Sequence, residues 1–125
     1  MRLPLDDGLK IGIQTIHRQP DEQTGPWLPQ IDELVHFVET VDAAGFDSLW
    51  VGDHLSMPLP FLDPMLMLTQ AAVVSRRLLL GTGVYLLPLR HPGPVAKQVA
   101  TLDHLSEGRF IFGVGIGGEF PKEYE

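Results

Sequence analysis

Cysteine is absent from the 125-residue chain, so disulfide bonds, thiolate metal ligands and cysteine nucleophiles are all excluded. No run of about 18 apolar residues occurs, which excludes an ordinary transmembrane helix from this sequence. The first ten residues lack the basic region and the apolar core of a signal peptide, and they contain Asp6 and Asp7 instead. We therefore expect a cytoplasmic protein with no membrane partner.

Basic residues are also scarce. Nine Lys and Arg side chains stand against 16 Asp and Glu, for a net charge of −7, whereas proteins that bind nucleic acid usually gather Lys and Arg on one face. We therefore expect no nucleic-acid partner. The hydrophobic fraction of 44% and the charged fraction of 20% are ordinary for a globular protein, and the length fits one domain over residues 1–125.

Apolar runs alternate with amphipathic segments along the chain. Alternation of this kind predicts an α/β fold with a parallel sheet and right-handed crossovers. An open doubly wound sheet and a segment of a (β/α)8 barrel both satisfy it, and both bind ligands at the carboxyl ends of their strands. The proline-rich segment 17–29 fits neither a helix nor a central strand. Strands are predicted at 10–15, 48–52, 78–87 and 109–114, and helices at 30–44, 64–75 and 92–105.

Asp53 and His54 follow the second predicted strand, at the edge of the sheet where ligands bind. An imidazole there can donate to a flavin or a substrate oxygen, or move a proton, because its pKa lies near working pH. A structural role is equally open: His54 would cap the following loop while Asp53 satisfies backbone amides.

Two further candidate site segments are rich in glycine. Gly81 and Gly83 interrupt the third predicted strand. Glycines there indicate a bulge, close approach by a ligand or another backbone, or packing against a bulky side chain of a neighbouring helix, and we favour packing slightly. The segment 113–118 is only loosely similar to a dinucleotide-binding fingerprint, and it follows the fourth strand, so a Rossmann site is disfavoured. A cofactor loop and a plain turn remain open for it.

The remaining arginine and histidine residues give weaker evidence for a functional site. Arg90 could pair with a phosphate or a carboxylate, and His91 precedes a helix N-terminus, but a solvated loop is the simpler interpretation. His17 lies in a polar loop and His36 on a predicted helix, and both are expected at the surface. His104 falls in the last turn of a predicted helix, where a partly charged imidazole favours the helix dipole. The five histidines show no HExxH or similar spacing, so no metal site is predicted.

Three segments together resemble the N-terminal half of the bacterial luciferase-like flavin-dependent oxidoreductases. They read AAGFDSLWVGDH, SRRLLLGTGVYLLPLRHP and AKQVATLDHLSEGRFIFGVGIGG, and they occur in the family's order and spacing. The resemblance implies a TIM barrel that uses FMN, or the deazaflavin coenzyme F420, for monooxygenation or hydride transfer on a small-molecule substrate. The RHP and GVGIGGE segments look most like the branch that uses F420.

The resemblance also implies roles for particular residues. Asp53 and His54 would lie beside the flavin ring, with His54 as the acid or base. Gly83 and Val84 match a bulge with a non-prolyl cis peptide behind the ring. The cofactor loop would be formed by Ile116, Gly117 and Gly118. Gly118 stands where the sugar-phosphate dehydrogenase branch has a carboxylate, and Glu119 comes one residue later, which argues against that activity.

A TIM barrel normally needs about 250 residues, whereas this chain holds four predicted strands. A half-barrel would expose unpaired strand edges and an apolar concave face. We therefore expect the chain, if stable alone, to be a homo-oligomer in which copies cover these surfaces. The alternatives are a fragment of a longer protein and a non-catalytic module that oligomerises or binds flavin weakly.

Overall fold

A computed structural model describes residues 8, 10–15, 20–21, 25–26, 28–57, 60–118 and 120–125 of the chain. Its centre is a parallel sheet of four strands with the order β1-β4-β5-β7. The strands span Gly12–Thr15 (β1), Ser48–Val51 (β4), Leu79–Thr82 (β5) and Phe110–Ile111 (β7). Each lies within a strand predicted from the sequence.

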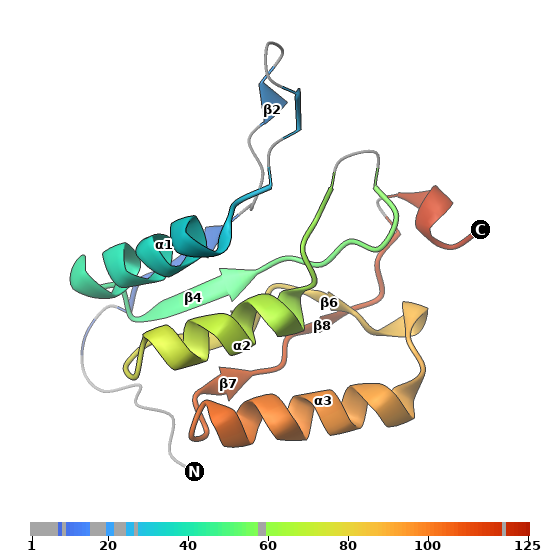
Figure 1. Cartoon of the computed structure of the whole chain (residues 1–125). Coiled ribbons are helices and arrows are strands. Elements are labelled where there is room, and N and C mark those ends of the chain that lie inside the picture. The colour runs from blue at the N-terminus through green and yellow to red at the C-terminus, as the bar shows by residue number, and fades with distance from the viewer. Residues whose placement is uncertain are drawn as a thin grey trace.

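Three helices connect these strands and lie along one side of the sheet (Figure 1). They are α1 (Ile31–Ala43), α2 (Pro64–Val74) and α3 (Pro92–Leu105), within one residue of the predicted ranges. The spatial order of the strands repeats their chain order, so the direction of winding never reverses. A doubly wound sheet requires such a reversal and carries helices on both faces. Between the two architectures left open by the sequence, the fold is therefore the barrel type.

Two of the predicted strands are interrupted. After β5 the chain bends at Gly83 and Val84 before β6 (Tyr85–Leu86), and after β7 it bends before β8 (Val114–Gly115). Strands β6 and β8 then pair in parallel with each other, beyond the main sheet. A small antiparallel pair, β2 (Pro20–Asp21) and β3 (Gly25–Pro26), falls in the proline-rich segment. Two short 3-10 helices complete the described chain, η1 (Leu87–Leu89) and η2 (Pro121–Glu123).

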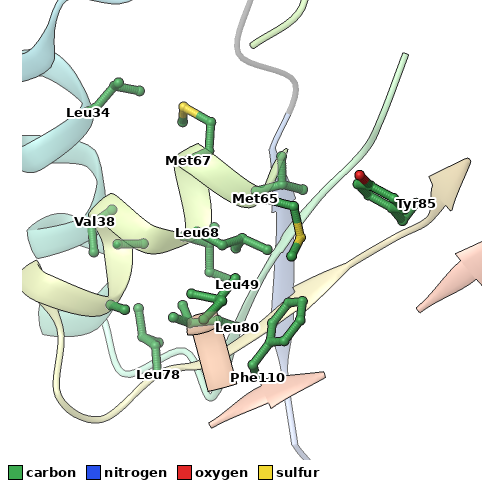
Figure 2. Packing of buried hydrophobic residues seen from close by; sticks show 14 of the residues in the cluster. Leu34, Val38, Leu49, Met65, Met67, Leu68, Leu78, Leu80, Tyr85 and Phe110 are labelled. Atoms are coloured by element: carbon green, nitrogen blue, oxygen red, sulfur yellow. The ribbon is translucent and has the colours of Figure 1, made fainter. Parts of the chain in front are cut away.

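The hydrophobic core lies between the helices and the sheet. Figure 2 shows Leu68 of α2 packed over Leu49 and Leu80 of the central strands. Leu68 and Leu80 are fully buried, and each such side chain contributes about 1.5–3 kcal/mol of hydrophobic stabilisation. Helix α2 is covered by α1, by α3 and by the sheet, which explains why its sequence is apolar on nearly every side.

Polar residues fix the helix ends. Asp63 caps α2, where its Oδ1 accepts hydrogen bonds from the backbone N–H groups of Met65 (2.9 Å) and Leu66 (3.1 Å), and Pro64 occupies the first helical position. Gly45 follows α1 with φ of 84°, a conformation that favours glycine. None of the described helices is both long enough and apolar enough to cross a membrane.

The other face of the sheet carries Trp50, whose indole lies between Gly12 of β1 and Gly81 of β5. A Cβ atom at either glycine would overlap the Trp50 side chain. Gly81 is therefore a packing residue, as we favoured, but the prediction of its neighbour was wrong. The bulky group comes from the adjacent strand β4 and not from a helix, because β4 and β5 lie in register with Trp50 opposite Gly81.

Candidate functional site

A cavity of about 590 Å³ opens at the carboxyl ends of the strands. The end of β1 and the chain segments that follow β4, β5 and β8 converge on it. The lining residues are Gln14, Thr15, Gly52, Asp53, His54, Met57, Phe61, Gly83, Val84, Leu86, Ile116, Gly117, Gly118, Phe120 and Glu123. All seven site residues predicted from the sequence are among them.

Asp53 is the most deeply buried of these predicted residues. Its side chain is 0% exposed, and both carboxylate oxygens are engaged by Arg90, with Leu86 N–H as a third donor at 2.9 Å. The Arg90 guanidinium, 13% exposed, also lies 4.5 Å from the centre of the Tyr85 ring. The simpler interpretation of Arg90 as part of a solvated loop was therefore wrong, because this side chain neutralises a buried carboxylate at the cavity wall.

His54 lies at the same wall and touches Glu123, which is 69 residues away in the sequence. The His54 Nδ1 atom lies 3.3 Å from Glu123 Oε2. Glu123 Oε1 accepts hydrogen bonds from the backbone N–H groups of Leu55 (2.7 Å) and Ser56 (3.2 Å). The short helix η2 thus closes onto the loop that follows β4 (Figure 1).

These contacts set the charge of Glu123. Burial alone would raise the pKa of its carboxyl group. The hydrogen bonds from Ser56, His54 and Leu55, with the charge of the imidazole, outweigh burial and hold the pKa below its ordinary value of 4.5. Glu123 is therefore an anion at neutral pH.

Two aromatic side chains hold the His54 ring from the sides. The ring meets Phe61 edge to face at a centroid distance of 4.7 Å and Phe120 at 5.3 Å. Such edge-to-face contacts restrict the orientation of the ring. The imidazole therefore reaches the cavity from a fixed direction.

Gly83 and Val84 are joined by a non-prolyl cis peptide bond, as the family resemblance implied. The Gly83 carbonyl oxygen accepts a hydrogen bond of 2.8 Å from Nε2 of Gln14, on the neighbouring end of β1. Val84 is 44% exposed and lines the cavity with an apolar surface. The interruption of the third predicted strand is therefore part of the site.

The glycine-rich loop after β8 also lines the cavity. Ile116 is 83% exposed, and its carbonyl oxygen accepts a hydrogen bond of 2.7 Å from the Tyr124 hydroxyl. Gly117 (φ 71°) and Gly118 (φ 116°) both adopt the left-handed region that favours glycine. The loop, for which the sequence left a cofactor loop and a plain turn open, therefore lines the cavity.

Several residues that line the cavity were not predicted from the sequence. Gln14, Phe61 and Phe120 carried no recognised motif, and Glu123 sits in a charged segment typical of a solvated surface. His36 is exposed, as expected, and His91 and His104 are exposed as well, whereas His17 lies outside the described residues. Within the described ranges, no group of three His, Cys, Asp or Glu residues is arranged to hold a metal ion.

Comparison with known proteins identifies the family. The model of the luciferase-like monooxygenases matches residues 9–125. The 4-hydroxyprotoasukamycin monooxygenase of Streptomyces nodosus subsp. asukaensis is 44% identical over 84 residues, which cover 66% of this chain and 23% of that protein. The chain therefore spans about a quarter of this relative's length.

Two solved structures share the fold. The oxygenating constituent of 3,6-diketocamphane monooxygenase from Pseudomonas putida, in complex with FMN, has a TM-score of 0.75 and 23% identity over 91% of this chain and 31% of its own. The coenzyme F420 dependent tetrahydromethanopterin reductase of Methanopyrus kandleri has a TM-score of 0.71 and 28% identity over 90% of this chain and 28% of its own. The two cofactors expected from the sequence are thus both represented. The four-stranded parallel array is part of a TIM barrel, and the chain belongs to the luciferase-like monooxygenase family.

Proposed function

We propose that this chain forms the cofactor-binding part of an oxidoreductase that uses FMN or coenzyme F420. The observation that carries the proposal is the convergence of His54, Val84 and the glycine loop on one cavity. The apolar side chains of Val84 and Ile116 suit a flat ring system, and the glycines leave backbone amides bare for its oxygen atoms. These apolar side chains and backbone amides therefore fit a flavin or a deazaflavin.

The residues that line the cavity would have different roles at a bound ring. Val84 and Ile116 would supply apolar contacts to the ring, Gly117 and Gly118 would allow close approach of the backbone, and His54 would supply a polar group. When bound, reduced FMN would activate dioxygen for insertion into a substrate, and F420 would transfer hydride.

The whole enzyme would then be a monooxygenase or an F420-dependent oxidoreductase acting on a small molecule. The similarity of the RHP and GVGIGGE segments to the F420 branch supports the second. We further propose a cytoplasmic location, with neither nucleic acid nor membrane as a partner. The acidic net charge argues against a nucleic-acid partner.

Titration of the purified full chain with FMN and, separately, with F420 tests the proposal. We expect saturable quenching of cofactor fluorescence by one of the two, with riboflavin as the control for recognition of the phosphate-bearing tail. The proposal is contradicted if far-ultraviolet circular dichroism shows a folded chain and neither cofactor binds.

A second candidate function is favoured by the open edges of the sheet. In the described chain, β1 and β7 each pair on one side only within the main sheet. Ile11 (52% exposed) directly precedes β1, and Val114 (50% exposed) lies in β8, which pairs with β6. We propose that further β/α units, or a second copy of the chain, cover these edges. Light scattering after size exclusion should then show an oligomer, and a stable folded monomer would contradict the second-copy arrangement.

A further inference from the structure

Glu123 is a buried carboxylate whose two oxygens have different partners. The side chain is 1% exposed. Oε1 receives the backbone amides of Leu55 and Ser56, at 2.7 Å and 3.2 Å, and Oε2 faces Nδ1 of His54 at 3.3 Å. The carboxylate therefore presents one oxygen to the backbone and the other to the imidazole.

This arrangement determines which imidazole nitrogen carries the proton. An ionised carboxylate only accepts hydrogen bonds, so the atom facing Oε2 must be a donor. For neutral His54 the donor is Nδ1–H, and Nε2 is left with a lone pair. Among the described residues, none makes a hydrogen bond to Nε2.

We propose that Glu123 is a positioning residue, which fixes His54 in the Nδ1–H tautomer and so presents an acceptor nitrogen at the cavity. The inference rests on the proposed function only in assigning the cavity to a cofactor and its substrate. It adds a chemical requirement: the ligand atom that meets Nε2 is a hydrogen-bond donor, an O–H or N–H group. A ligand offering only a carbonyl oxygen there would leave two acceptors facing each other.

A merely structural role for Glu123 is the competing explanation, because it also caps the Leu55 and Ser56 amides. The two explanations differ in what a neutral, isosteric replacement does. In Glu123→Gln, the amide oxygen stays with the two backbone donors, and the amide nitrogen then faces His54 Nδ1. That nitrogen is itself a donor, so Nδ1 must become the acceptor and the tautomer inverts to Nε2–H.

Nitrogen-15 NMR of the imidazole rings in the full chain, without cofactor, measures this directly. At a pH where His54 is neutral, we expect a protonated-type shift for Nδ1 and an unprotonated-type shift for Nε2, with the signals assigned by their loss in His54→Asn. In Glu123→Gln the two shift types should exchange. Glu125→Gln, which changes an exposed carboxylate two residues away, should leave them as in the wild type.

The NMR spectra decide whether Glu123 sets the tautomer of His54. A wild-type Nε2–H tautomer, or a Glu123→Gln spectrum with the wild-type tautomer, overturns it. If Glu123→Gln fails to fold, the wild-type spectrum and Glu123→Asp decide instead, since the shorter carboxylate still only accepts and should retain Nδ1–H. Because no cofactor is present, the tautomer result is independent of the titration with FMN and F420, and either proposal can fail alone.

Discussion

The guanidinium group of Arg90 makes a bidentate contact with the carboxylate of Asp53: Nη1 lies 2.6 Å from Oδ2 and Nη2 lies 2.7 Å from Oδ1. Arg90 Nη1 also donates to the Leu86 carbonyl oxygen at 3.2 Å, and the Leu86 N–H donates to Asp53. The pair therefore joins the end of β4 to the segment from β6 through η1. This connection holds one wall of the cavity in place.

Removing one partner of this pair should destabilise the fold strongly. In Asp53→Ala, Arg90 would keep its charge with no counter-ion and Leu86 N–H would lose its acceptor, for an expected loss of about 3–5 kcal/mol in the free energy of unfolding. Urea denaturation followed by circular dichroism measures it. Asp103→Ala, at an exposed carboxylate of α3, should change stability by no more than about 0.5 kcal/mol. A loss below about 1 kcal/mol for Asp53→Ala would show that the pair is not structurally important.

Acid stability should depend on Asp42. Its pKa lies below the ordinary value of 3.8, first because the Ser75 hydroxyl donates to Oδ2 at 2.6 Å, and also because Arg77 Nε donates to Oδ1 at 2.8 Å. A carboxyl group with a lowered folded-state pKa stabilises the protein above its unfolded-state pKa. That stabilisation disappears as the pH falls through the folded-state pKa.

The variant Ser75→Ala should therefore raise the pKa of Asp42 and flatten the loss of stability between about pH 5 and about pH 2. Carbon-13 titration of the Asp42 carboxyl group measures the first effect. Thr101→Ala is a matched control, since that hydroxyl donates to the backbone oxygen of Lys97. An unchanged Asp42 pKa in Ser75→Ala would refute this assignment of the cause.

The packing of Trp50 predicts a coupled pair of substitutions. Gly81→Ala places a methyl group against the indole and should cost about 1–3 kcal/mol through overpacking. In a Trp50→Phe background the same change should cost less, because the smaller ring leaves room. A double-mutant cycle by urea unfolding measures the coupling, and additivity within about 0.5 kcal/mol would contradict it. Gly93→Ala is the control, because its Cβ would lie 3.6 Å from the nearest His91 atom, an ordinary contact.

Much of the fold could be predicted because its determinants are local. The helix limits followed from apolar spacing, from Asp63 and from Gly45. Strands β4 and β5 lie in short apolar runs, and β1 lies in a segment of apolar and β-branched residues. The interruption at Gly83 and Val84 was not predicted from periodicity, since the apolar run continues through it to Leu87. The glycines at 81 and 83 indicated a bulge or a close approach in this strand, and the family resemblance implied the cis peptide bond.

The site was harder to predict because its determinants are distant in sequence. All seven predicted residues line the cavity, yet Arg90 and Glu123 meet their partners across 37 and 69 residues. A charged segment ending in Lys122, Glu123, Tyr124 and Glu125 is typical of a solvated surface. Only the fold brings η2 against the β4 loop, where one of these carboxylates becomes buried.

Cofactor binding should depend on Ile116 without any loss of fold stability. Ile116 is 83% exposed, so Ile116→Asp should change the free energy of unfolding by no more than about 0.5 kcal/mol. It replaces an apolar contact of the ring with a charge and should weaken binding of FMN or F420 at least about tenfold, which corresponds to about 1.4 kcal/mol. Fluorescence titration measures the loss. Ile31→Asp, at a residue 60% exposed on α1, is the matched control, and equal affinities for the two variants would argue against the loop as a cofactor site.

The central claim is that the cavity at the carboxyl ends of the strands binds the cofactor, and NMR mapping of the labelled full chain tests it most directly. On addition of FMN or F420, we expect saturable shift changes concentrated on the backbone amides of Val84, Ile116, Gly117 and Gly118 and on the His54 ring. A folded chain with no saturable changes, or with changes confined to the helical face formed by α2 and α3, would contradict the account.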